Sequence, residues 1–360
     1  MTASRAWWKW ALVYATLAIA GSIFLVHHAI PEGGDFHYFQ RGARRLFGAD
    51  GLHVYTRMGA LIIGPLALAV DRLVLALGGA DVLPAIGLAL GIGVVALVHR
   101  LSGARPAVVL IGGLCFLWPW SDMIRFGHLE DGIVYAFVAA SAWAIVRRRP
   151  VLLGVFLGCA AASKQWGFIF LPLALAVPTE RDQTVALGTG FGIAAVSWLP
   201  FVLADGGTLG GLTGVSSAQP GSLPGVLGIV RYGALMPDWW RLAEVGALFI
   251  VCVVVVTRLD WYAAPFIVMA MRCTLDPYTW SYYAAGVLFG AFLLDAMQRR
   301  RFPIWSVVGL VYVSEVLNHL EPGMRAIVRV VVLVGVIVGV VVTSRRPNVV
   351  GAVASAEHQG

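Results

Sequence analysis

Asp35 is the residue in this sequence whose chemistry is most readily assigned. It lies in the polar run 31–51, directly after the first long apolar stretch, and Arg41, Arg44 and Arg45 follow on the next turns. A carboxylate held at a membrane surface beside arginines suits a catalytic base next to a site for a phosphate. The alternative is that Asp35 caps a helix while the arginines bind lipid headgroups. Both can hold together, because a cap keeps the carboxylate in one place.

The residues after Asp35 predict a short helix that lies on the membrane surface. Its apolar side chains recur at helical spacing, and the arginines fall on the opposite face. Asp35 is favourable as the N-cap and Gly48 as the residue just past the end. His37 and Tyr38, in the first turn, are candidate substrate contacts. The apolar positions are Phe36, Phe39, Ala43, Leu46 and Phe47.

A second group of ionisable residues precedes the apolar run that starts near residue 130. Such groups are costly near lipid unless they line a wet site, which favours binding of a phosphate or a substrate. The alternative is an ordinary polar loop with acidic residues at a helix N-terminus. No second histidine has ligand spacing, so we expect no metal. The residues are Asp122, Arg125, His128, Glu130 and Asp131.

Lys164 is flanked on both sides by more than ten mostly apolar residues. Its ammonium must reach water, an acid or an anion. We predict that it binds a phosphate, because two short helices meet there; the alternatives are snorkelling to the interface and an ion pair with a carboxylate. A fourth run, 276–283, carries Tyr278, Trp280 and Tyr282. These rings form either an aromatic belt or a platform for a sugar or isoprenoid.

The composition predicts the elements that position these residues. Of 360 residues, 59% are hydrophobic and only 12% are charged. We therefore expect an all-α, polytopic membrane protein with about 12–13 hydrophobic helices in a single domain, because lipid leaves no partner for an open backbone. The four cysteines lie in or beside apolar segments and read as packing residues. The segments are 7–30, 59–77, 82–98, 107–119, 130–146, 151–163, 165–178, 184–203, 239–257, 260–275, 282–297, 304–319 and 324–343.

Short basic loops predict the orientation of the chain. Basic residues at 99–105, 147–149, 181, 258, 299–301 and 345–346 indicate cytoplasmic loops. This places 31–58, 118–129, 204–238 and 276–281 on the external face of the plasma membrane. The net charge of +7 is spread over these loops and does not indicate nucleic acid. Alternation fails unless 59–77 or 82–98 does not cross, and we choose 59–77. The long loop 204–238, rich in Gly, Ser and Pro, could cover a site.

Several motifs of residues 31–178 occur in an order found in one family. In this order they resemble the GT-C superfamily of integral-membrane glycosyltransferases and, more closely, glycosyltransferase family 87, the actinobacterial mannosyltransferases that use polyprenyl-phosphate mannose. Tyr55-Thr56-Arg57-Met58 departs from the family's Tyr-Pro-Pro region, and Glu130-Asp131 adds two carboxylates, so a different substrate is allowed. The motifs are 35–48, Tyr55, Gly64-Pro65-Leu66, Gly127-His128, 154–164 with the later Pro172, and a weaker match at 276–283.

The resemblance implies an inverting glycosyltransferase that moves mannose or another hexose or pentose from a polyprenyl-phosphate donor to a lipid or glycan acceptor. It implies Asp35 as the base, with Arg41, Arg125, His128 and Lys164 near the donor phosphate. His37, Tyr38, Glu130, Asp131, Tyr278, Trp280 and Tyr282 are expected at the substrates. No cofactor or metal is expected, and membrane lipids are the other partners. The alternatives are a flippase for lipid-linked sugars and a non-catalytic envelope-assembly partner; the oligomeric state is open.

Overall fold

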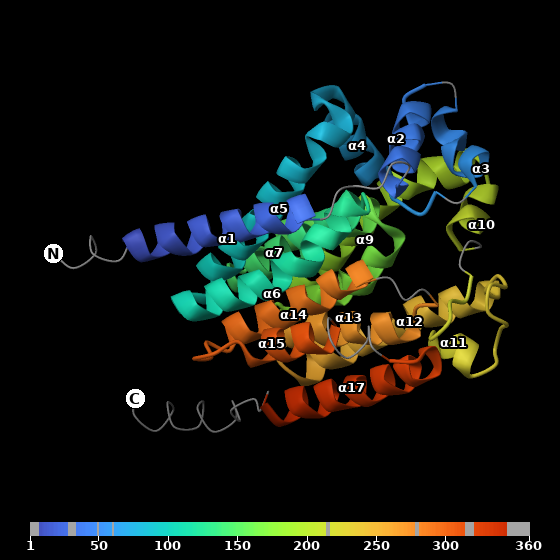
Figure 1. Cartoon of the computed structure of the whole chain (residues 1–360). Helices are drawn as coiled ribbons and strands as arrows, with labels where there is room; N and C mark the ends of the chain where they lie inside the picture. The colour runs from blue at the N-terminus through green and yellow to red at the C-terminus, as the bar shows by residue number, and fades with distance from the viewer. Residues whose placement is uncertain are drawn as a thin grey trace.

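The computed structural model describes residues 7–27, 34–48, 50–59, 61–213, 217–277, 281–313 and 320–343. These residues are helical apart from loops and one isolated pairing of Ser217 with Leu235 (Figure 1). Within them, seven helices are long and apolar enough to cross a membrane, by length and composition: α1, α5, α6, α7, α9, α12 and α17. The expected all-α fold is thus confirmed for these residues, and the seven long apolar helices are consistent with a polytopic membrane protein. Every one of the thirteen predicted segments contains a helix.

The bounds of the helices are as follows: α1 Trp7–His27, α2 Asp35–Leu46, η2 Gly51–His53, α3 Val54–Met58, α4 Pro65–Leu77, η3 Gly79–Asp81, α5 Leu83–Ser102, α6 Pro106–Arg125, α7 Leu129–Val146, α8 Pro150–Ser163, η4 Gln165–Ala176, α9 Glu180–Ala204, α10 Gly207–Thr213, α11 Leu223–Val226, α12 Asp238–Arg258, η5 Trp261–Ala263, α13 Ala264–Leu275, η6 Ser281–Tyr283, α14 Ala284–Met297, α15 Ile304–Val311 and α17 Pro322–Thr343.

Proline and glycine set several of these boundaries. Pro65, Pro106 and Pro150 stand at the starts of α4, α6 and α8, where a missing N–H leaves no hydrogen bond unmade. Gly103 ends α5 in the left-handed region, with φ of 60°, which a residue with a side chain adopts less readily. The short loops that result keep successive helices antiparallel.

The polar loops gather at one end of the bundle, as the sequence predicted. In Figure 1, α2, α3, α10 and α11 lie at the end opposite the start of α1 and the end of α17. The loop that starts at Asp205 is tied to the first loop, because Thr56 donates a hydrogen bond to Asp205. It is also tied to the 276–281 turn, because the Gln219 N–H donates to the Pro277 carbonyl at 3.1 Å. We name this the loop end.

The helix α4 belongs to this loop end and packs against α2, while α5 is long enough to cross. With 13 residues, α4 is not among the seven helices long enough to cross, and which of 59–77 and 82–98 crosses stays a prediction. At the opposite end, Arg299 donates to the Ser102 carbonyl at 3.2 Å, which joins two loops that the sequence placed on the cytoplasmic side.

Candidate functional site

Asp35 begins α2 and lies beside His128. The Oδ2 atom of Asp35 is 2.9 Å from Nε2 of His128, and the Asp35 side chain is 61% exposed whereas that of His128 is 2% exposed. The N-cap is Gly34, and no side chain caps this helix, so the expectation that Asp35 is the N-cap is wrong. The carboxylate is instead directed to another loop by an ion pair. It keeps an accessible side toward the loop end.

The 126–128 turn brings His128 against α2. Gly127 adopts a φ of 87°, and a Cβ atom there would overlap the backbone of Phe36. Only glycine gives both the backbone conformation and the close approach. The ring of Tyr282 stacks on the His128 ring at 4.3 Å between centroids, and Phe39 meets it edge-on at 5.5 Å. Contacts with these two aromatic rings hold the imidazole in one orientation.

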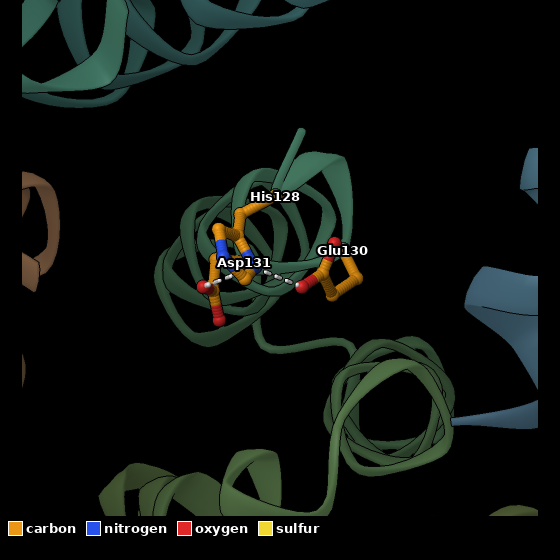
Figure 2. Close-up of side chains that lie close together, drawn as sticks. All are labelled: His128, Glu130 and Asp131. Atoms are coloured by element: carbon orange, nitrogen blue, oxygen red, sulfur yellow. Dashed lines mark hydrogen bonds and ion pairs between the residues drawn. The ribbon is translucent and has the colours of Figure 1, made fainter. Parts of the chain in front are cut away.

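His128 belongs to a buried group of charged residues, which we call the ion cluster: His128, Glu130, Asp131 and Lys164. Figure 2 shows His128 and the two carboxylates at the start of α7. Nδ1 of His128 is 2.7 Å from Glu130 Oε1. Nζ of Lys164 is 2.8 Å from Glu130 Oε1 and 2.9 Å from Asp131 Oδ1. Trp166 donates to Asp131 Oδ1 at 3.0 Å.

Lys164 lies at the turn between α8 and η4. With 14 residues, α8 is only about 21 Å long, whereas a hydrocarbon core is about 30 Å thick. Moving an ion there costs several kcal/mol, which close opposite charges must offset. The sequence left open whether Lys164 meets a phosphate or a carboxylate, and in the structure its ammonium contacts two carboxylates. Glu130 and Asp131 are likewise buried rather than open to a substrate.

The two ring nitrogens of His128 lie 2.9 and 2.7 Å from carboxylate oxygens of Asp35 and Glu130, which favours a proton on both nitrogens. Burial opposes the charged imidazolium, but Glu130 and Asp35 outweigh it and raise the pKa of His128 to about 9. In turn, the His128 contact holds the pKa of Asp35 below its usual value, against the opposing effect of burial. Asp35 is therefore an ionised carboxylate with a fixed cationic neighbour.

His128, Glu130 and Asp131 also have the residue types of a metal site, with one ligand atom of each within 4.8 Å of the others. The ammonium of Lys164, however, already lies at hydrogen-bonding distance from both carboxylates. Together with the imidazolium, it supplies the positive charge that these acids need. The donor set therefore fits internal ion pairing better than a bound cation. That the protein needs no metal stays a prediction.

A second charged network adjoins the ion cluster and was not foreseen from the sequence. Arg272, on α13, is buried between the rings of Trp166 and Tyr283, at 4.5 and 4.6 Å from their centroids. Its Nη2 is 3.6 Å from Asp276, which also lies 3.4 Å from Arg241. The signal available in the sequence was an arginine inside the apolar segment 260–275, which resembles a snorkelling side chain.

The structure also shows the contacts of Asp122, Arg125 and Tyr38, which the sequence had singled out. Arg125 is 3.9 Å from Asp122, and Asp122 accepts a hydrogen bond from Ser281 at 3.2 Å. The hydroxyl of Tyr38 donates to the Met58 carbonyl at 2.6 Å, which closes the first loop.

The exposed residues of α2 do not join the ion cluster. Arg41, Arg44, Arg45 and His37 are exposed on the polar face, as predicted, and no ion pair among the described residues joins Arg41 to Asp35. Of the three aromatic residues predicted at the substrate, Tyr282 lies on His128, whereas Tyr278 and Trp280 lie outside the described residues.

No family model, no curated protein and no solved structure matches this chain. The resemblance to the GT-C superfamily and to glycosyltransferase family 87 therefore stays a prediction from the motifs.

Proposed function

We propose that this protein is a membrane glycosyltransferase that transfers a sugar from a polyprenyl-phosphate donor to a lipid or glycan acceptor, with inversion, at the external face of the plasma membrane. One observation carries the proposal. An exposed carboxylate, Asp35, is bound to an imidazolium that buried carboxylates hold in place, at the loop end of a polytopic bundle. Such charge at membrane depth is costly and marks function more often than stability.

In this proposal Asp35 is the general base. An Oδ atom of Asp35 takes the proton from the acceptor hydroxyl, and the hydroxyl oxygen forms a bond to the anomeric carbon. The bond from that carbon to the phosphate oxygen breaks, and its electron pair leaves with polyprenyl phosphate. A lowered pKa keeps Asp35 ionised but makes it a weak base, so proton transfer is expected late, once the attacking oxygen has become acidic.

The phosphate that leaves must be stabilised by positive charge. The sequence suggested Arg41, Arg125, His128 and Lys164 for this role. We now favour Arg125, which lies at the end of α6 near the 281–283 turn, with His128 supplying charge from behind Asp35. Lys164 is assigned to holding Glu130 and Asp131, which keep His128 protonated. Tyr282, which is buried, keeps its ring stacked on His128, and side chains provide the positive charge without a metal or other cofactor.

The test is direct. Purified protein is incubated with a radiolabelled polyprenyl-phosphate mannose and a membrane extract as acceptor, and released polyprenyl phosphate is measured with and without EDTA. Release that requires Asp35 supports the proposal. Movement of the intact donor across proteoliposomes without release would instead identify a flippase, and neither activity with any hexosyl or pentosyl donor would favour the assembly role.

A further inference from the structure

A cavity lies between α13, α14, α15 and α17, beside the ion cluster but apart from it. Its volume is about 100 Å³. Two arginines, Arg325 and Arg329, belong to its wall, and no acidic side chain does among the described residues. An apolar cavity with a few polar groups at one place is the usual form of a small-molecule site.

The lining of this cavity changes character along the helix axes. On α17 the lining residues are Arg325 and Arg329 near its start, then Val332 and Val336 deeper in the helix. The same order holds on α13, where Cys273 and Thr274 lie near the loop end and Phe266 lies deep. The cavity is thus polar at the loop end and apolar below. This is the polarity of an amphiphile with its head at the loop end.

Arg329 shows what kind of head the cavity suits. It is buried, with 7% of its surface exposed, and one Nη atom donates to the Cys273 carbonyl at 3.3 Å. Its Nε has no hydrogen-bond partner among the described residues. A buried guanidinium with an unmade hydrogen bond is costly, and an anionic oxygen would satisfy it. Phosphate is the anion whose geometry the guanidinium fork fits best.

The head of the cavity is linked to the ion cluster through the 281–283 turn. Ser281 lines the cavity and donates to Asp122 at 3.2 Å. Tyr283 lines it too and lies 4.8 Å from Tyr282, whose ring stacks on His128 at 4.3 Å. Two ring contacts therefore separate the cavity wall from the imidazole that holds Asp35. The 281–283 turn is therefore shared by the cavity wall and by the surroundings of the ion cluster.

We propose that this cavity binds a lipid monophosphate, with its hydrocarbon chain between α13, α15 and α17 and its phosphate on Arg329. The link to the donor rests on the proposed function, whereas binding of the lipid phosphate does not. Arg325 and Tyr312, at the same level of the cavity, complete the polar end.

The experiment uses the full-length protein and dodecyl phosphate that carries a diazirine at the chain end. We expect adducts on the deep wall, at Phe266, Trp305 or Val336, and at least fivefold less labelling in Arg329→Met. Arg181→Met, which removes an exposed arginine at the start of α9, should label like wild type. Arg329→Lys, which keeps the charge, should retain part of the labelling. Together with melting curves, this variant distinguishes a loss of binding from a folding defect.

Two results would overturn the inference: adducts on lipid-facing helices alone, or labelling that Arg329→Met leaves unchanged in a folded protein. Competition identifies the source of the phosphate. Preferential competition by polyprenyl-phosphate mannose assigns the cavity to the donor, and equal competition by phosphatidylglycerol vesicles assigns it to a headgroup. Equal competition by inorganic phosphate would overturn the proposed role of the hydrocarbon chain in binding. Asp35→Asn should label normally, so loss of transfer with intact labelling separates this inference from the proposed function.

Discussion

Oδ2 of Asp35 lies 2.9 Å from Nε2 of His128 and thereby joins the first loop to the loop before α7. The contact connects an exposed carboxylate to a buried imidazolium whose other nitrogen is 2.7 Å from Glu130. Two aromatic neighbours and two carboxylates hold His128 in place. Because His128 is held in this way, it fixes the position of the Asp35 carboxylate. Fixed placement of a charged group is what base catalysis requires.

Asp35→Asn should reduce transfer by at least about 100-fold, since one general base contributes 10²–10⁴-fold. Asparagine keeps the shape and a hydrogen-bond acceptor, so expression and melting temperature should stay close to wild type. The measurement is polyprenyl phosphate release. Asp50→Asn, which removes a carboxylate of the same loop that pairs with Arg45 at 3.5 Å, is the control. Substantial activity in Asp35→Asn would reduce Asp35 to a structural role.

The charge on His128 predicts an alkaline limit. With its pKa raised to about 9, His128 contributes stability that is fully present below its ordinary pKa of about 6.5 and is lost as the pH rises through about 9. The melting temperature and the transfer rate should both fall there, and His128→Gln should remove this limb from the melting profile. Asp35 acts in the opposite sense, because its contribution is lost on acidification below its ordinary pKa. A flat melting profile between about pH 7 and 10 would contradict the imidazolium.

Lys164→Met should destabilise the ligand-free protein by about 3–5 kcal/mol, because it leaves two buried carboxylates without their cation. Lys9→Met, at the only other lysine in the sequence and in an exposed position, should have little effect. Adding Glu130→Gln to Lys164→Met should recover part of the loss, since one stranded charge is removed. If Lys164→Met melts like wild type but binds donor weakly, the phosphate role first predicted for Lys164 is restored.

Gly127→Ala should lower transfer at modest cost to the rest of the bundle. An added Cβ would overlap the Phe36 backbone at the start of α2, and φ of 87° disfavours alanine, so Asp35 must move off His128. Gly188→Ala, where a Cβ meets open space on α9, is the matched control and should be neutral or slightly stabilising. Equal activity of the two variants would show that the position of Asp35 tolerates displacement.

Cysteine labelling tests the orientation. A Ser217→Cys variant should react with an impermeant maleimide in intact cells, whereas Arg181→Cys should react only after permeabilisation. The background is a variant in which the native cysteines, all free in the structure, are replaced by alanine. The reverse pattern would place the loop end, and Asp35 with it, in the cytoplasm.

The sequence alone determined the membrane class, the thirteen helical segments, the grouping of loops at each end and the exposed and buried faces of α2. These follow from constraints that act locally: lipid forces each apolar segment to satisfy its own backbone, and prolines and glycines mark the ends. It also selected Asp35, His128, Glu130, Asp131 and Lys164, because ionisable residues among apolar ones are conspicuous.

Only the tertiary structure decided which charges meet. Lys164 and Glu130 are 34 residues apart, and their contact depends on how α7 packs against the turn between α8 and η4. An ammonium pairs equally well with a phosphate and with a carboxylate, and the sequence does not show which of the two lies beside it. The partner of Lys164 could therefore not be predicted. Arg272 was missed for the same reason: an arginine in an apolar segment looks the same whether it reaches the interface or lies between Trp166 and Tyr283. Coulomb energy depends on distances across the bundle, and these arise only once the helices pack.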